Sequence, residues 1–475
     1  MKILFATSEA TPFAQSGGLA EVAGALPKAL VKKGHDVRII MPLYATVTPA
    51  QRQEMEFQCW FNVPVAWRSQ YCGIFKTKVG NVIYYLVDNE YYFKRAGLYG
   101  YYDDAERFTY FSRAVLETIS HIDDFKPDII HCNDWQTALI PLYYNCFYKN
   151  REGYENIRTV YTIHNIQYQG VYGKELLNEV IGISPPDYSL IDYNGLVNFS
   201  KSAIECCNKI TTVSPSYADE ILDPWYSHGL DNILRKDLWK LTGILNGIDV
   251  ESYNPQTDKA LKYNYSVSKK ANKAKCKQEL EDFFGFEHKP EVPIIALVSR
   301  LVSHKGLDLV TNIIDDLLNK AEVRFVVLGS GDIEYEDFFR GLAARHYDKF
   351  RIELGFKTQL ARQIYAGADM FLMPSKSEPC GLSQMIALRY GTIPIVRETG
   401  GLKDSVSDCG DGVGNGFTFK TYNAQDMEWA INRALNLYYN NKAEWKNLVD
   451  RAMKCDNSWA KSADLYVEMY KEASM

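Results

Sequence analysis

The sequence contains no apolar run that approaches the ~18 uninterrupted residues a membrane helix needs. At its start, four apolar residues follow Lys2 before the chain becomes polar, a pattern typical of a buried strand rather than a signal peptide. Low-complexity tracts are also missing. These absences argue against a membrane-spanning or disordered protein, and we expect a folded, cytoplasmic protein that does not bind membranes.

An excess of positive charge is missing too. The chain carries 53 Lys and Arg against 59 Asp and Glu, so no overall field would attract nucleic acid. Any anionic ligand must therefore be met by local cations. The ten cysteines are scattered without a CxxC pair, which indicates reduced thiols and argues against a disulfide framework or a zinc site.

Short strand-like runs alternate with helical patterns along all 475 residues, which predicts α/β architecture with parallel sheets covered by helices. The predicted strands are 2–6, 37–41, 82–87, 128–132, 159–163, 209–213, 294–299, 324–328, 351–354, 370–373 and 393–396. The predicted helices include 18–33, 105–121, 305–319, 335–345, 358–367 and 382–390. We expect two doubly wound domains, joined near the turn-prone residues 246–249, with the charged segment 258–277 forming a solvated helix.

Two similar glycine-rich turns follow strands in the two halves, QSGGL at 15–19 and ETGGL at 398–402. Adjacent glycines before a helix expose N–H groups at the positive end of the helix dipole, where a phosphate binds favourably. A tight turn without a ligand is the alternative for either loop alone. Neither half has GxGxxG at its first turn, which disfavours a dehydrogenase.

Charged residues also gather at predicted strand ends. Arg300 and Lys305 lie where a strand runs into a helix start, a position that disfavours cations unless an anion joins them. Glu378 precedes a proline, which keeps its backbone extended at the mouth of the sheet. The alternatives are a surface ion pair for the two cations and a helix N-terminal acid for Glu378. Together they suit a diphosphate and a sugar.

The first half places polar and aromatic residues at two strand ends, HCNDWQT at 131–137 and TIHNIQYQG at 162–170. Carbohydrate sites combine these types, because amides and carboxylates hold hydroxyls while aromatic faces cover sugar rings. Neither stretch is decisive alone.

Together with these stretches, a longer series of motifs resembles bacterial glycogen synthases and plant starch synthases, in order and over essentially the whole chain. The further motifs are SGGLAEVAGALPK from Ser16, GLYG from Gly97, DAERF from Asp104, TTVSP from Thr211, GILNGID from Gly243, KGL from Lys305 and EPCGL from Glu378. The resemblance implies a GT-B glycosyltransferase with two Rossmann-like domains that face each other across a cleft. Residues 1–246 would form the first domain, 247–455 the second, and 456–475 a helix that returns to the first.

The resemblance also implies the reaction: transfer of glucose from ADP-glucose to the non-reducing end of an α-1,4-glucan such as glycogen, with retention of configuration and without a metal or other cofactor. Carried over to this sequence, the catalytic residues are Glu378, Arg300, Lys305, His164 and Asp134. The donor-binding residues are Gln15, Gly17, Gly18, Asn246 and a backbone-amide phosphate cradle formed by Thr399, Gly400, Gly401 and Leu402. Trp135, Glu9 and Tyr92 are assigned to the acceptor glucan.

One position departs from the family pattern, because Gln15 stands where relatives carry a lysine that binds the donor. A neutral amide can donate a hydrogen bond but lacks the charge of an ammonium. We therefore expect weaker donor binding and keep two alternatives open: UDP-glucose as donor, or a feebly active glucan-binding or priming paralogue. Asn133 and Gln136 also stand where bacterial members often carry histidine.

Trp60, Trp67 and Trp225 are expected to be buried, because tryptophan is largely buried on average. The alternative is that they form secondary glucan sites on the surface.

Overall fold

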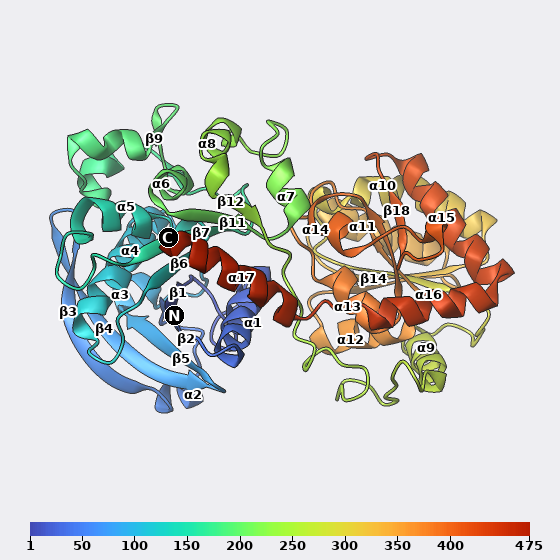
Figure 1. Cartoon of the computed structure of the whole chain (residues 1–475). Helices are drawn as coiled ribbons and strands as arrows, with labels where there is room; N and C mark the ends of the chain where they lie inside the picture. Colours follow the sequence, from blue (N-terminus) through green and yellow to red (C-terminus); the bar gives the residue numbers. More distant parts are fainter. The chain divides into compact units, whose positions relative to one another are not determined.

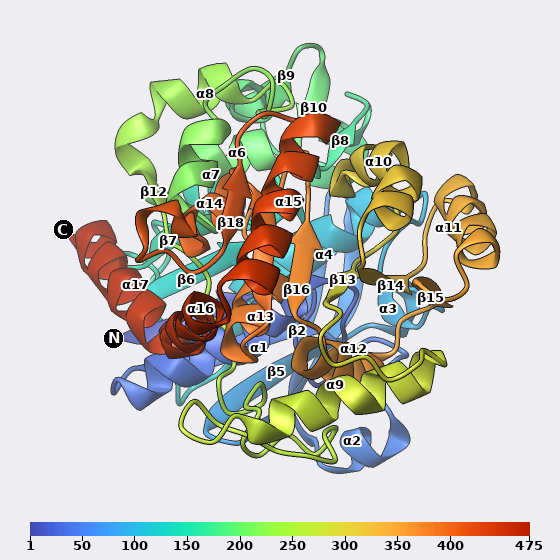
Figure 2. The same cartoon turned by 90° about the vertical axis from the view of Figure 1, so that its right-hand side faces the viewer.

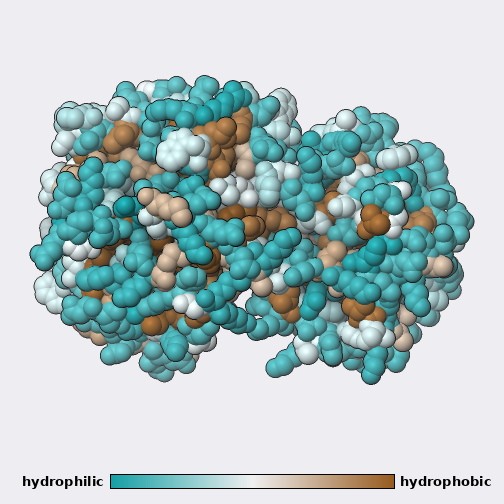
Figure 3. All heavy atoms as spheres, viewed as in Figure 1, coloured by the Kyte–Doolittle hydropathy of each residue, from teal (hydrophilic) through white to brown (hydrophobic).

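The computed structural model describes all 475 residues and divides into two compact units (Figure 1). Unit 1 comprises Met1–Gly247 and Trp459–Met475, and unit 2 comprises Ile248–Ser458. No helix is both long enough and apolar enough to cross a membrane. On the face in Figure 3, hydrophobic residues appear as patches among hydrophilic ones.

Unit 1 is built on a nine-stranded sheet of order β12-β11-β7-β6-β1-β2-β5-β4-β3. Its strands are β1 (Lys2–Ala6), β2 (Asp36–Pro42), β3 (Glu56–Val65), β4 (Arg68–Val79), β5 (Val82–Asp88), β6 (Ile129–Asn133), β7 (Arg158–Ile163), β11 (Lys209–Thr212) and β12 (Leu241–Gly243). A small separate sheet holds β8 (Val171–Tyr172), β9 (Asp192–Tyr193) and β10 (Leu196–Asn198). The six strands predicted for this half are confirmed. The antiparallel β3–β4 hairpin was not predicted, because its outward face interrupts the apolar pattern.

The helices of unit 1 are α1 (Gly18–Lys32), α2 (Pro49–Gln53), α3 (Glu90–Phe93), α4 (Asp104–His121), α5 (Leu139–Tyr143), α6 (Phe199–Cys206), α7 (Pro215–Glu220), α8 (Asp231–Lys236) and, from the end of the chain, α17 (Trp459–Ser474). Helix α17 packs on α1 and β7. Its buried residues Trp459, Ala463, Tyr466 and Tyr470 recur at helical spacing, which gives it one apolar face. The Tyr470 hydroxyl lies 2.7 Å from Nδ1 of the buried His131 on β6, so a polar contact fixes the helix to the sheet.

Unit 2 contains a six-stranded parallel sheet of order β15-β14-β13-β16-β17-β18, with helices on both faces (Figures 1 and 2). The strands are β13 (Ile294–Val298), β14 (Arg324–Gly329), β15 (Phe350–Leu354), β16 (Met370–Met373), β17 (Ile393–Arg397) and β18 (Phe417–Phe419). The helices are α9 (Ala271–Phe284), α10 (Leu307–Lys320), α11 (Ile333–Arg345), α12 (Thr358–Gly367), α13 (Ser383–Arg389), α14 (Gly400–Ser405), α15 (Ala424–Asn440) and α16 (Lys442–Lys454). All five strands predicted for this half are confirmed.

The charged segment 258–277 is a helix only in its last part, since α9 begins at Ala271. Asp258, at its start, is buried rather than solvated: its carboxylate pairs with Arg362 at 3.0 Å and accepts a hydrogen bond from Tyr390. The predicted solvated helix is therefore wrong for residues 258–270, because tertiary contacts hold them as turns.

The three tryptophans expected in the core are exposed. Trp60 is 61% exposed, Trp67 75% and Trp225 72%. Trp60 points outward from β3, Trp67 lies in the turn between β3 and β4, and Trp225 lies between α7 and α8. No helix or strand covers these three side chains. The prediction of burial, which relied on the average behaviour of tryptophan, is therefore wrong for all three.

Candidate active site

Lys305 and Glu378 form an ion pair in unit 2, with 2.6 Å between Nζ and Oε2. The hydroxyl of Ser375 donates to the same carboxylate oxygen at 2.9 Å. Burial raises the pKa of Glu378, but the Lys305 charge and the hydrogen bonds from Lys305 and Ser375 outweigh it and leave the pKa below its ordinary value. Glu378 is therefore a buried carboxylate at neutral pH.

A close approach of two loops brings this pair together. Strand β13 leads into the short 3-10 turn Ser303–Lys305, which ends at Gly306 with φ of 75°. A Cβ at Gly306 would lie 2.0 Å from the carbonyl oxygen of Pro374, just after β16. Only glycine allows this contact, which places Lys305 against the loop that carries Glu378.

Arg300, by contrast, is exposed and forms no ion pair within the chain. Its neighbour His304 is neutral at pH 7, because burial and the charges of Lys305 and Arg300 lower its pKa. The loop that follows the carboxyl end of β13 thus carries two cations. The guanidinium of Arg300 is unpaired, and the ammonium of Lys305 is paired with Glu378.

The second glycine turn supports Glu378 directly. Gly400 has φ of 43°, and a Cβ there would lie 2.1 Å from the Glu378 carbonyl oxygen. The N–H of Gly401 donates to that carbonyl at 3.1 Å, while those of Thr399 and Leu402 donate to Arg397 and Thr399 at 3.0 Å each. The loop thus holds the backbone of Glu378, and three of its four N–H groups donate within the chain; the phosphate cradle itself stays a prediction.

In unit 1, Asp134 and His164 follow the carboxyl ends of neighbouring strands β6 and β7 and lie together. The His164 N–H donates to Oδ1 of Asp134 at 2.7 Å. Burial raises the pKa of Asp134 to about 7, although the N–H groups of His164 and Asn165 oppose the shift. Asp134 also has φ of 58°, an uncommon backbone conformation for this residue type, which the surrounding contacts must maintain.

The imidazole of His164 is held in one tautomer. Burial lowers the pKa of His164 to about 3, so the ring is neutral at pH 7. Nε2 lies 2.9 Å from Oδ1 of Asn133, whose amide nitrogen donates to the Ala6 carbonyl at 3.0 Å. Since that orientation makes Oδ1 an acceptor, Nε2 carries the proton and Nδ1 is left as an acceptor.

The first glycine loop is open and is anchored by a buried acid. A Cβ at Gly17 or Gly18 would meet nothing within 4 Å, and both residues are exposed, Gly17 just before α1 and Gly18 as its first residue. Glu9 is buried, and Oε2 accepts from the N–H and the hydroxyl of Ser16 at 2.7 and 2.6 Å. Gln15 is exposed, with Nε2 3.4 Å from Oε1 of Glu21. Glu9 therefore positions the loop, and its assignment to the acceptor glucan stays a prediction.

The remaining predicted residues of unit 1 differ in how far they are exposed to a ligand. Trp135 is half-buried and stands edge-on to Phe108, with ring centroids 5.2 Å apart. Asn246 is buried, and its Oδ1 has no hydrogen-bond partner. Tyr92 is fully buried and its hydroxyl donates to Glu106 at 2.6 Å, so it offers no ring face to a glucan and that assignment is wrong.

Sequence reasoning missed the residues that hold the predicted ones in place: Ser375 on Glu378, Ser16 on Glu9 and Asn133 on His164. Ser16 lies inside the QSGGL motif, one residue from Gln15, and Ser375 lies three residues before Glu378, so short polar neighbours were the available signal. Nothing in the spacing of Asn133 and His164, 31 residues apart, indicates their contact.

Comparisons with known proteins cover the whole chain. Residues 2–236 match the family model for the starch synthase catalytic domain, and residues 278–449 match that for glycosyl transferases group 1. Glycogen synthase of Clostridium acetobutylicum is 49% identical over 99% of both chains, and that of Bacillus cereus (strain B4264) is 48% identical over 99% of both.

Two solved structures are also similar. The catalytic domain of starch synthase IV from Arabidopsis thaliana, bound to ADP and acarbose, matches with a TM-score of 0.91 and 35% identity, covering 100% of this chain and 99% of that one. Sucrose-phosphate synthase from Thermosynechococcus elongatus matches with a TM-score of 0.61 at 15% identity, covering 99% of this chain and 98% of that one, a likeness of fold alone.

Proposed function

The chain belongs to the glycogen and starch synthase family of glycosyltransferases, with the GT-B fold, and we propose that it transfers glucose from ADP-glucose to the non-reducing end of an α-1,4-glucan with retention of configuration. The observation that carries the residue assignment is the buried Lys305–Glu378 pair beside the unpaired Arg300. The ADP and acarbose bound to the similar starch synthase support a nucleoside diphosphate and a glucan as ligands.

Arg300 and Lys305 bind the diphosphate of the donor in this proposal. As the bond from the sugar to the diphosphate breaks, negative charge grows on the leaving group, and fixed cations stabilise it more in the transition state than in the ground state. The guanidinium of Arg300 has no competing carboxylate. An ammonium can donate three hydrogen bonds, so the bond from Lys305 to Glu378 leaves two for phosphate oxygens.

Glu378 stabilises the positive charge that develops on the glucosyl ring. It is ionised at neutral pH and held by Lys305 and Ser375, so it needs no reorganisation when that charge appears. Lys305 acts on both charges of the transition state. Its ammonium stabilises the negative charge on the leaving diphosphate, and its hydrogen bond to Glu378 orients the carboxylate toward the positive sugar ring.

The residues of unit 1 bind sugar hydroxyls. His164 presents a neutral ring whose Nδ1 accepts a hydrogen bond, and it cannot serve as a general acid near neutral pH because its pKa is about 3. The Asp134 carboxyl accepts from the backbone N–H of His164, which orients it toward a sugar hydroxyl in this proposal. Trp135, half-buried in its aromatic cluster, covers the apolar face of a glucose ring.

We propose further that the reaction needs no resident cofactor, since Arg300 and Lys305 supply the charge that a diphosphate leaving group requires. No group of three or more His, Cys, Asp and Glu is placed to hold a metal ion. Activity measured after exhaustive dialysis against a chelator is expected to equal that of untreated protein, and activity restored only by an added divalent cation would contradict this part of the proposal.

The proposed reaction is tested by measuring nucleotide release from ADP-glucose and UDP-glucose, each with and without glycogen, together with digestion of the product by an enzyme specific for α-1,4 bonds. We expect glycogen-dependent release of ADP and a digestible extension. Faster release of UDP would reassign the donor. Glycogen binding without release from either donor would indicate the non-catalytic alternative.

A further inference from the structure

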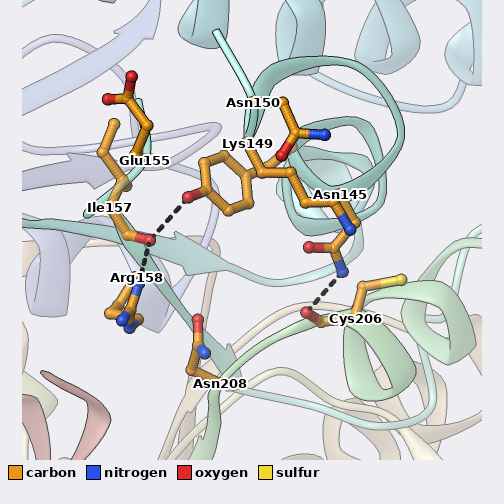
Figure 4. Close-up of a pocket in the computed structure, with 9 residues that line it drawn as sticks. Asn145, Lys149, Asn150, Glu155, Ile157, Arg158, Cys206 and Asn208 are labelled. Carbon is orange, nitrogen blue, oxygen red and sulfur yellow. Dashed lines mark hydrogen bonds between the residues drawn. The ribbon is translucent and has the colours of Figure 1, made fainter. Parts of the chain in front are cut away.

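A polar cavity of about 300 Å³ lies in unit 1, and none of the residues assigned to glucosyl transfer lines it (Figure 4). One wall is formed by Arg158, the first residue of β7, and by Asn208, just before β11. The opposite wall follows the helical turn Tyr144–Tyr148 and includes Asn145 and Lys149. The cavity thus lies at the amino ends of two neighbouring parallel strands.

This position separates the cavity from the residues of unit 1 that the proposed function uses. His164 follows the other end of β7, and six residues at ~3.3 Å each span about 20 Å. A ligand in this cavity therefore lies at the other end of β7 from His164.

The cations of the cavity have no carboxylate partners. Neither Lys149 nor Arg158 forms an ion pair, and Arg158 makes only a hydrogen bond of 3.3 Å to the Ile157 carbonyl. The lining contains one carboxylate, Glu155, which accepts from the Gly153 N–H at 2.9 Å and points away from Arg158 in Figure 4. The lining therefore carries two cations and one carboxylate, an excess of one positive charge, and neither cation is held in an ion pair.

The neutral groups of the lining add hydrogen-bond donors and little else. The side-chain oxygen of Asn208 accepts from the Thr159 N–H at 2.9 Å, which leaves its NH₂ as a donor. The carbonyl of Ile157 accepts from Tyr144 at 2.9 Å, and that of Cys206 accepts from Asn145 at 3.1 Å. Figure 4 shows the side-chain oxygen of Asn145 turned toward the middle of the cavity, where it would accept a hydrogen bond from a ligand hydroxyl.

We propose that this cavity binds a phosphate group, either as inorganic phosphate or as the ester of a small hydroxyl-bearing metabolite. Arg158 and Lys149 would form charge-assisted hydrogen bonds to the phosphate oxygens, with the Asn208 amide as a third donor. The bonds from Tyr144, Asn145 and Asn208 to the surrounding backbone fix the walls before the ligand arrives, which lowers the cost of binding.

The test is calorimetric titration of the full chain with inorganic phosphate, with glycerol 3-phosphate and with glycerol as a neutral control. Each titration is repeated on the Arg300→Gln variant, so that phosphate bound by the proposed donor site is recognised and subtracted. We expect one saturable phosphate site that persists in Arg300→Gln. Tighter binding of glycerol 3-phosphate would identify an ester as the ligand, and equal or weaker binding would identify inorganic phosphate.

The double variant Lys149→Gln/Arg158→Gln is expected to weaken phosphate binding at this site about tenfold or more. It removes both charge-assisted hydrogen bonds to the phosphate, and these are the strongest contacts that the cavity offers. Its matched control, Lys78→Gln/Lys94→Gln, removes the same charge from exposed positions of unit 1 and should leave binding unchanged. Since Arg158 is half-buried, Lys149→Gln alone, at an exposed residue, is measured as well and should weaken binding severalfold.

Three results would overturn the proposal: no saturable binding beyond that lost in Arg300→Gln, binding unaffected by the Lys149 and Arg158 substitutions, or an equal loss in the control. None of these bears on glucosyl transfer, which the nucleotide-release assay tests separately.

Discussion

At the scale of single residues, Gln15 is the clearest departure of this chain from its family. Its amide faces Glu21 at 3.4 Å and carries no charge, while Glu9 sits buried beneath the same loop. Two acidic residues therefore lie near the start of α1, and Gln15 supplies no positive charge to offset them. We expect this loop to bind an anionic donor more weakly than a loop with lysine at this position.

Replacing Gln15 by lysine should lower the Michaelis constant for ADP-glucose about two- to fivefold, the effect of one added exposed charge. Initial rates over a range of donor concentrations measure it. Gln15→Met is the matched control, since it keeps the length without the charge and should not lower the constant. An unchanged or higher constant in Gln15→Lys would show that position 15 does not face the donor.

Asp134 is expected to make stability depend on pH. Its pKa is about 7 in the folded chain against 3.8 as the ordinary value, so between pH 4 and 7 the folded state binds more protons than the unfolded state. The free energy of unfolding therefore falls as pH rises through that window, by up to about 3 kcal/mol. Urea unfolding of the wild type and Asp134→Asn at several pH values measures this, and identical pH dependence in both would contradict it.

At the scale of elements, the strands were predictable because buried parallel strands are continuous apolar runs, whereas the β3–β4 hairpin was not, because its outward residues break the run. The site was predictable only in part. Strand-end motifs identified Lys305 and Glu378, but their contact depends on Gly306 meeting Pro374 across 68 residues, which no local pattern contains. The hydrogen bonds from Gly401 to Glu378 and from Ser16 to Glu9 could not be predicted either, since they form only in the fold.

Gly306→Ala tests the loop contact that positions Lys305. The new Cβ would clash with the Pro374 carbonyl oxygen and strain a φ of 75°, so we expect a loss of about 1–3 kcal/mol in stability and at least about tenfold in kcat.

Gly285→Ala is the control, because Gly285 has φ of 67° but nothing within 4 Å of its Cβ position. It should lose stability without losing kcat. Equal effects of the two substitutions on kcat would mean that the Gly306 contact does not position the site.

At the scale of the whole molecule, the chain crosses between its two units twice, after Gly247 and after Ser458, and its last helix belongs to the unit that contains its first strand. Each unit has its own sheet and its own buried core. Two residues 339 positions apart in the sequence, His131 and Tyr470, make one of the polar contacts that attach α17 to unit 1.

Tyr470→Phe should therefore lower the stability of unit 1 alone, by about 1–2 kcal/mol, because the buried His131 loses a hydrogen-bond partner. Calorimetric unfolding is expected to show one shifted transition and one unshifted transition. Tyr102→Phe, at a 95% exposed residue, should shift neither. A shift of both transitions by Tyr470→Phe would show that the two units unfold together.

The most direct test of the account is the rate of glycogen-dependent ADP release by the wild type, Glu378→Gln and Glu287→Gln. Glu378→Gln keeps the shape of the side chain but removes the charge that Lys305 and Ser375 hold, and we predict a fall of about 10²–10³ in kcat. Glu287→Gln removes a carboxylate that is 76% exposed in the same unit and should leave kcat unchanged. A Glu378→Gln enzyme that retains wild-type kcat would contradict the central claim that this carboxylate stabilises the transferred glucosyl group.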